Sequence, residues 1–187
     1  MIGNKVQFVL GGARSGKSQF AEKLALQLLH AKGAADEKST AKLVYIATAV
    51  AFDDEMQARI DIHKARRGPE WQVCDAPIEL PSMIRAHRGA ANIVLVDCVS
   101  IWITNILINK LNTERYIKSL ISSINSVSGQ IILVSSETGL GIIPDNKLSR
   151  QFRDANGLTN QTIAAAAQRV FFLVAGIAQT IKAPDDR

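Results

Sequence analysis

The chain has 187 residues, of which 47% are hydrophobic, and its formal net charge at neutral pH is +5. A chain of this length buries most of the surface that its unfolded form exposes, so we expect a single globular domain over residues 1–187. No apolar run reaches the roughly 18 residues that span a bilayer, and the N-terminus lacks the pattern of a cleavable signal peptide. We therefore expect a cytoplasmic protein without a membrane span.

The positive charge favours anionic partners such as nucleotides and phosphorylated metabolites. Only 5% of the residues are aromatic, which leaves little material for stacking on bases, so we expect no nucleic-acid partner. The two cysteines, Cys74 and Cys98, belong to no CxxC or Cys/His pattern. Buried thiols are therefore expected, and neither a zinc site nor a disulfide is.

Short apolar runs alternate along the chain with longer amphipathic ones. Strands are expected at residues 6–10, 42–47, 92–97, 130–135, 170–174 and 179–182. Helical spacing is found at residues 17–31, 53–67, 78–87, 99–111, 114–127 and 159–168, and Gly33 and the Gly68-Pro69 pair are expected to end helices. The alternation indicates an α/β fold in which a mostly parallel sheet is flanked by helices.

A phosphate-binding loop is predicted directly after the first strand. Residues 11–18 read GGARSGKS, which satisfies G-x-x-x-x-G-K-[ST] between a strand-like run and a helical one. In such a loop, glycines let successive N–H groups point at phosphate oxygens, the lysine reaches the β- and γ-phosphates, and the hydroxyl of the last residue holds Mg²⁺. The candidate nucleotide-binding residues are Gly11, Gly12, Ala13, Arg14, Ser15, Gly16, Lys17 and Ser18, with Lys17 also catalytic and Ser18 also a metal ligand.

Two carboxylates follow later predicted strands. Asp97 closes the run IVLVD and is the candidate partner of Ser18 at the Mg²⁺ ion, with a helix cap as the alternative. Glu137 follows the run IILVS, at the sheet edge where open α/β folds bind ligands, and is expected to share the metal or to orient a water or hydroxyl.

A histidine lies among arginines in the predicted helix 53–67. Arg59, His63 and Arg67 repeat every four residues and so share one helix face. Neighbouring arginines favour the neutral imidazole, whose free nitrogen is a nucleophile, and they can also hold the phosphates of a nucleotide. The alternative is an ordinary surface histidine.

Several segments of the chain resemble one family, that of the bifunctional adenosylcobinamide kinase/adenosylcobinamide-phosphate guanylyltransferases. They are GGARSGKSQFAE, YIATA, DDEMQARIDIHKARRGPEW, VLVDCVSIWITNIL and the long segment from SSETGLGIIPDNKLSRQFRDANGLTNQ onward. The last is the most specific, because many enzymes share a P-loop.

The resemblance implies a RecA-like P-loop domain, a homotrimer and covalent guanylylation of His63. It implies two reactions that use Mg²⁺ with ATP or GTP. In the first, a γ-phosphoryl group passes to adenosylcobinamide. In the second, GMP from GTP passes to the resulting adenosylcobinamide phosphate, which gives adenosylcobinamide-GDP. Arg59 and Arg67 are the first candidates for stabilising charge during the second transfer.

The chain departs from the family pattern at three places. Ser136-Glu137-Thr138-Gly139 replaces the common Asn-Glu-Val-Gly, Gln168 replaces an aspartate, and the segment 33–41 is longer than expected. Glu137 remains a candidate, whereas Gln168 cannot act as an acid or a metal ligand.

Two other interpretations remain open. One is a different small-molecule P-loop kinase in which His63 has no role. The other is a guanine-nucleotide switch or an assembly ATPase, against which the chain has Asn146-Lys147-Leu148-Ser149 where a guanine reader needs Asn-Lys-x-Asp.

Roles in the C-terminal segment also stay open. Arg150, Arg153 and Asp154 share one predicted helical turn, where they either contact a subunit or nucleotide or form an internal salt bridge. Asn160 and Gln161 receive no assignment.

Overall fold

The computed structural model describes residues 5–35, 41–50 and 68–184. Its strands are β1 (Val6–Gly11), β2 (Lys42–Ala47), β3 (Trp71–Asp75), β4 (Asn92–Asp97), β5 (Gln130–Ser136), β6 (Arg169–Val174) and β7 (Ile177–Lys182). Its helices are α1 (Lys17–Ala35), α3 (Leu80–Ala86), α4 (Val99–Ile108), α5 (Thr113–Asn125) and α6 (Lys147–Ala166).

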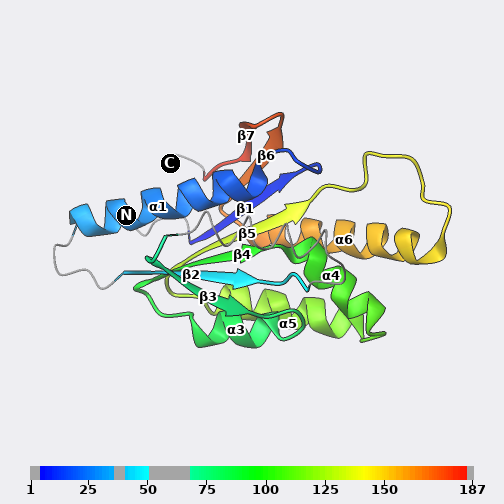
Figure 1. The fold of residues 1–187 in the computed structure, drawn as a ribbon, viewed down its shortest axis with the longest axis horizontal. Coiled ribbons are helices and arrows are strands. Elements are labelled where there is room, and N and C mark those ends of the chain that lie inside the picture. Colours follow the sequence, from blue (N-terminus) through cyan, green and yellow to red (C-terminus); the bar gives the residue numbers. More distant parts are fainter. Residues whose placement is uncertain (1–4, 36–40, 51–67, 185–187) are drawn as a thin grey trace.

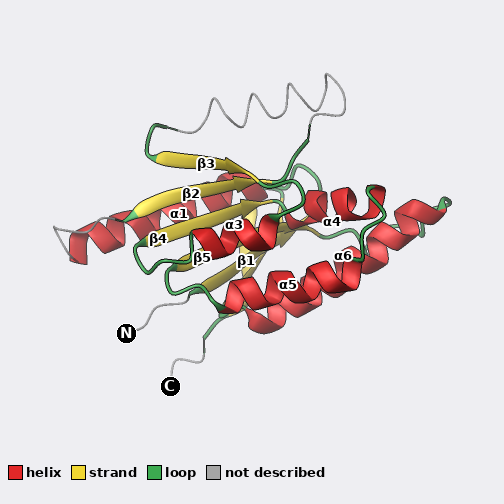
Figure 2. Ribbon diagram, turned by 90° about the horizontal axis from the view of Figure 1, so that it is seen from below, coloured by secondary structure: helices red, strands yellow, loops and turns green. Residues whose placement is uncertain are grey.

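The strands form one sheet with the order β3-β2-β4-β5-β1-β6-β7. All neighbours are parallel except β6 and β7, which form an antiparallel hairpin at one edge. Helix α1 covers one face of the sheet, and α3, α5 and α6 cover the other (Figures 1 and 2). The α/β prediction of a mostly parallel sheet between helices is confirmed.

Two apolar cores lie on the two faces of the sheet because side chains alternate along each strand. One core faces α3, α4, α5 and α6, and it includes Phe8, Val44, Val94 and Ile131. Toward α1 point residues such as Val9, Tyr45, Leu95 and Ile132. Central strands that are buried on both faces need nearly continuous apolar sequences, which explains why β1, β4 and β5 were predictable.

Several predicted boundaries were wrong. Helix α6 begins at Lys147, twelve residues before the predicted start at residue 159, and α1 continues through Gly33 to Ala35. Strand β3 was not predicted, because only Trp71 of its five residues is buried and the run therefore lacks an apolar pattern. Among the described residues, the sheet has seven strands where six were expected.

The departure at Gln168 has a structural role at the start of β6. Its side-chain Oε1 accepts a hydrogen bond from the Val6 N–H at 2.7 Å, and its own N–H donates to the Val6 carbonyl at 3.0 Å. Gln168 therefore joins the beginnings of β1 and β6, at the end of the sheet opposite the carboxyl ends of the strands.

Candidate active site

The predicted phosphate-binding loop connects β1 to α1 at the carboxyl end of the sheet. Arg14 and Gly16 both have left-handed backbone conformations, with φ 54° and 92°, which curl the chain before α1 begins at Lys17. The Lys17 ammonium donates to the Gly12 carbonyl at 2.5 Å across this loop. The curled backbone and the first turn of α1 together form the arrangement in which proteins bind phosphate groups.

Electrostatics around Lys17 favour a role with anions. Burial lowers the pKa of Lys17, while nearby Cys98 and Asp97 raise it. Because burial raises the pKa of the Cys98 thiol to about 12, that thiol is neutral at pH 7, and Asp97 is the anion that stabilises the ammonium. A cation in such a partly desolvated place attracts a phosphate more strongly than one in water does.

The turn between β6 and β7 supports the phosphate-binding loop. The sequence did not predict this contact. The Gly176 N–H donates to the Ser15 carbonyl at 3.0 Å, and Gly176 has a positive φ of 81°. A Cβ on Gly16 would lie 3.4 Å from the Gly176 Cα, and one on Gly11 only 2.5 Å from the Leu173 carbonyl oxygen. The two glycines of the loop thus permit close packing against a segment about 160 residues later in the chain.

Asp97 ends β4, between Ala47 of β2 and Val134 of β5. Its Oδ2 accepts a hydrogen bond from the Tyr45 hydroxyl at 2.8 Å. The N-cap of α4 is Cys98, so the capping alternative for Asp97 does not describe this position. Asp97 and Lys17 lie close enough to influence each other electrostatically, which brings the predicted carboxylate to the predicted loop.

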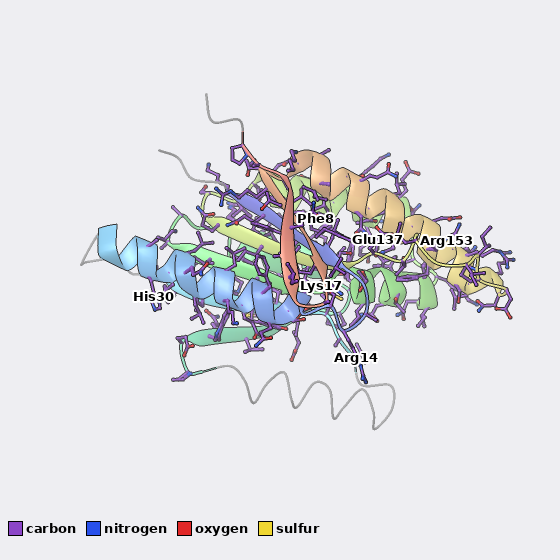
Figure 3. All side chains as sticks on the ribbon, turned by 90° about the horizontal axis from the view of Figure 1, so that it is seen from above. Phe8, Arg14, Lys17, His30, Glu137 and Arg153 are labelled. Atoms are coloured by element: carbon purple, nitrogen blue, oxygen red, sulfur yellow. The ribbon has the colours of Figure 1, made fainter. Side chains whose placement is uncertain are left out.

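Glu137 follows β5 and lies beside the first residue of the loop. Its backbone N–H donates to the Gly11 carbonyl at 3.0 Å, and its Oε1 accepts from the Gly139 N–H at 2.5 Å. Figure 3 shows Glu137 and Lys17 toward the same end of the sheet, whereas His30 lies near the other end of α1. The three predicted elements of the phosphate-binding site, the loop, Asp97 and Glu137, therefore lie at the same edge of the sheet.

Side chains of two helices hold the Ser136 backbone immediately before Glu137. The Ser136 carbonyl accepts from Asn156 Nδ2 at 2.8 Å and from Asn160 Nδ2 at 3.1 Å, while the Ser136 N–H donates to Ser100 Oγ at 2.7 Å. This gives Asn160 the role that the sequence left open. It also explains how the chain tolerates its departure from the family pattern at Ser136, whose main chain makes these bonds.

The remaining C-terminal candidates make local contacts. Arg150 donates to the carbonyls of Pro144 and Asp145, at 3.0 and 2.6 Å. Arg153 lies 3.9 Å from Asp154 in an internal ion pair, one of the two alternatives left by the sequence. Gln161 is exposed.

The segment Asn146-Lys147-Leu148-Ser149, which partly matches a guanine-binding motif, has a local structural role. Asn146 caps α6, and its side chain accepts from the Ser149 N–H at 2.8 Å. This capping bond accounts for the asparagine without a bound base, which weakens the interpretation as a switch.

Three predicted site residues, Arg59, His63 and Arg67, lie outside the described residues. In the part of the chain that is described, no group of three or more His, Cys, Asp or Glu side chains is arranged to hold a metal ion. Nor is any described helix long and apolar enough to cross a membrane.

Residues 7–181 match the family described as cobinamide kinase / cobinamide phosphate guanyltransferase. The chain belongs to this family. It is 41% identical to the bifunctional adenosylcobalamin biosynthesis protein CobP of Pseudomonas aeruginosa, over 93% of this chain and 95% of that protein. It is 35% identical to the proteins of the same description named CobU in Escherichia coli and Salmonella typhimurium, over 93% of this chain and 98% of each of them.

Family membership confirms the resemblance found in the sequence, and with it a P-loop fold and an enzyme with both kinase and guanylyltransferase activities in adenosylcobalamin biosynthesis. The match spans the loop, Asp97 and Glu137 described above, and also the segment that contains His63.

Proposed function

We propose that the described site carries out the kinase step and that His63 carries the guanylyl group in the second step. In the first reaction, a γ-phosphoryl group moves from ATP or GTP to the aminopropanol hydroxyl of adenosylcobinamide. In the second, GMP moves from GTP to the new phosphate and gives adenosylcobinamide-GDP. The observation that carries the kinase assignment is the position of Lys17 in a chain of this family: it is bonded to the Gly12 carbonyl of the curled loop and lies within the electrostatic reach of Asp97.

For the kinase step, the roles follow from the contacts. The N–H groups of residues 11–18 bind the phosphate oxygens, and Lys17 neutralises charge on the β- and γ-phosphates. Arg14 is exposed at the rim of the loop, where it adds a contact to a phosphate. Glu137, tied to Gly11 through its backbone, orients the acceptor hydroxyl or shares the metal.

The oxygen chemistry of Ser18 and Asp97 fits Mg²⁺. This ion is usually held by one or two carboxylates together with waters and substrate phosphates, so a protein cage of several carboxylates is not needed. Bound there, Mg²⁺ would neutralise charge on the β- and γ-phosphates. Ser18 is in the first turn of α1 and Asp97 is at the end of β4, so both come from the carboxyl side of the sheet.

For the guanylyl step, a ring nitrogen of neutral His63 attacks the α-phosphorus of GTP. A nitrogen–phosphorus bond forms as the bond to pyrophosphate breaks, and pyrophosphate leaves. The phosphate of adenosylcobinamide phosphate then attacks the same phosphorus and breaks the nitrogen–phosphorus bond, which frees the histidine. Arg59 and Arg67 stabilise the charge on the phosphoryl oxygens. The support for these three residues is the family match over residues 7–181.

The proposal includes a homotrimer in the cytoplasm. Apolar side chains exposed after β5, among them Leu140 and Ile142, supply a surface that a neighbouring subunit would cover. A cytoplasmic location would give the enzyme access to ATP and GTP.

The test uses GTP labelled on either the α- or the γ-phosphate. Purified enzyme with Mg²⁺ is expected to retain α-label and not γ-label after denaturation, through an acid-labile bond that His63→Ala abolishes. His30→Ala is the matched control, because His30 lies far from Lys17 along α1 (Figure 3). Transfer of γ-label to cobinamide without any α-label on the protein would make this chain a kinase only, as in the alternative interpretation.

A further inference from the structure

We propose that Tyr45 is a positioning residue of the kinase site: its hydroxyl holds the Asp97 carboxylate by Oδ2 and so leaves Oδ1 for the hydrated Mg²⁺ of the nucleotide complex. The inference rests on the proposed role of Asp97 at the metal. It gives a function to the YIATA segment, which carried the family resemblance but received no role from the sequence.

The geometry at Tyr45 is tightly defined. Its side chain is buried, with 3% of its surface exposed, on the face of β2 that α1 covers. Its ring packs edge-on against Trp71, with 5.9 Å between the ring centres. The hydroxyl donates to Asp97 Oδ2 at 2.8 Å. A hydrogen bond to a charged acceptor is stronger than a neutral one, so this rigid phenol can fix a carboxylate.

The backbone beside Asp97 is held from β2 as well. Thr48, which is fully buried, donates through Oγ1 to the Cys98 carbonyl at 2.7 Å and accepts from the Cys98 N–H at 2.9 Å. The Thr48 N–H donates to the Asp97 carbonyl at 3.3 Å, and the Thr48 carbonyl accepts from Asn105 Nδ2 at 2.8 Å. These bonds fix the main chain at Asp97 and Cys98. The Asp97 carboxyl group can still rotate, and the hydrogen bond from Tyr45 restricts that rotation.

That freedom matters because the terminal torsion of an aspartate is broad and has no sharp staggered minima. A carboxylate that serves a metal needs a second partner to orient it, and loss of such a partner costs about 10–100-fold in metal affinity or activity. Tyr45 supplies this partner from the neighbouring strand, where it pairs with Leu95, two residues before Asp97.

The experiment compares Tyr45→Phe with Tyr116→Phe, which changes the only other tyrosine in the chain. Tyr116 also packs edge-on against a tryptophan, Trp102, with ring centres 6.2 Å apart, but its hydroxyl faces Glu79 on the surface at 3.5 Å. Each variant, together with Asp97→Asn, is titrated with Mn²⁺ in the presence of a non-hydrolysable ATP analogue, and free Mn²⁺ is measured by its paramagnetic resonance signal. Binding of the analogue is also measured in EDTA, and thermal unfolding is followed.

Tyr45→Phe is expected to raise the Mn²⁺ dissociation constant about tenfold. It should leave analogue binding in EDTA unchanged, and excess Mg²⁺ should restore its kinase rate. Tyr116→Phe should match the wild type in every assay.

Two results would overturn the inference while leaving the role of Asp97 intact, provided that Asp97→Asn weakens Mn²⁺ binding. One is wild-type Mn²⁺ affinity in Tyr45→Phe. The other is equal weakening of analogue binding with and without metal, together with a lowered unfolding temperature, which would make Tyr45 merely structural. If Asp97→Asn binds Mn²⁺ like the wild type, the proposed role of Asp97 fails, and the role of Tyr45 fails with it.

Discussion

At the scale of single residues, burial and a neighbouring charge have opposite effects on the pKa of Lys17. Burial disfavours the Lys17 ammonium, and Asp97 compensates. Cys98 lies in the same place, yet burial keeps it in its neutral form. The Lys17 cation therefore lies within the electrostatic reach of the Asp97 anion, and the thiol near them adds no charge at neutral pH.

The protonation of Cys98 leads to a prediction about thiol labelling. Because the pKa of this thiol is raised to about 12, its thiolate fraction at pH 8 is about one in 10,000, and thiolate is the form that reacts. Burial and Asp75 also raise the pKa of Cys74, but this thiol is partly exposed, so iodoacetamide at pH 8 is expected to label it well before Cys98. The difference should vanish in denaturant. Labelling is followed by mass spectrometry of peptides. Equal rates at the two cysteines in the native protein would contradict the structure around Asp97.

The sequence predicted the residues of the site that belong to local patterns and missed those that act across the fold. Lys17 and Asp97 stand out because a glycine-rich loop and a strand end mark them. Tyr45 and Gly176 have no such mark, since their roles arise only when β2 lies beside β4 and the β6–β7 turn lies beside the loop. A single sequence contains no spacing that reports these contacts.

At the scale of elements, predictability followed burial for most strands, although β7 is mostly exposed and was predicted in part. The central strands β1, β4 and β5 are buried on both faces and were found. Strand β3 is mostly exposed at the sheet edge and was missed. The early turns of α6 are also largely exposed, so apolar spacing does not mark them as helical. The structure shows that the helix begins after its capping residue, Asn146.

The β6–β7 turn is the element whose role is most directly testable. In Gly176→Ala, the added methyl group meets no atom within 4 Å, but φ 81° disfavours any residue other than glycine. We expect a loss of about 1 kcal/mol in the free energy of unfolding and weaker ATP binding, because the strained turn shifts the N–H that holds Ser15. Urea unfolding and nucleotide titration measure the two effects.

Ala175→Gly is the matched control for the turn. Ala175 also has a positive φ, of 51°, so glycine at this neighbouring position relieves backbone strain instead of adding it. Nucleotide affinity should stay at the wild-type value. If Gly176→Ala binds ATP as tightly as this control, the turn does not support the loop.

At the scale of the whole molecule, the parallel sheet brings together segments that are far apart in the chain. The loop after β1, the end of β4 and the segment after β5 meet at one edge because parallel strands all end on the same side. The α/β class could be predicted from alternating patterns, whereas the strand order could not, since local sequence does not say which strands become neighbours.

The loop between β5 and α6 extends beyond the carboxyl end of the sheet (Figure 1) and carries an exposed apolar surface. Leu140, Ile142 and Ile143 are 83%, 95% and 66% exposed. Burying such side chains against a partner stabilises by about 1.5–3 kcal/mol each, so we expect this surface to lie within the proposed trimer. Ile142→Asp should dissociate the trimer, because the interface would then bury an unpaired carboxylate.

Sedimentation equilibrium measures the mass of each form directly. Ile181→Asp, at a residue of β7 that is 55% exposed, is the control for adding a charge at an exposed isoleucine elsewhere, and it should keep the wild-type mass. A trimer that persists in Ile142→Asp would place the subunit contact on another surface, and a monomeric wild type would remove the trimer from the proposal. If the trimer dissociates while labelling of His63 by α-labelled GTP persists, each subunit forms the guanylyl site alone. Joint loss of trimer and label would mean that neighbouring subunits complete it.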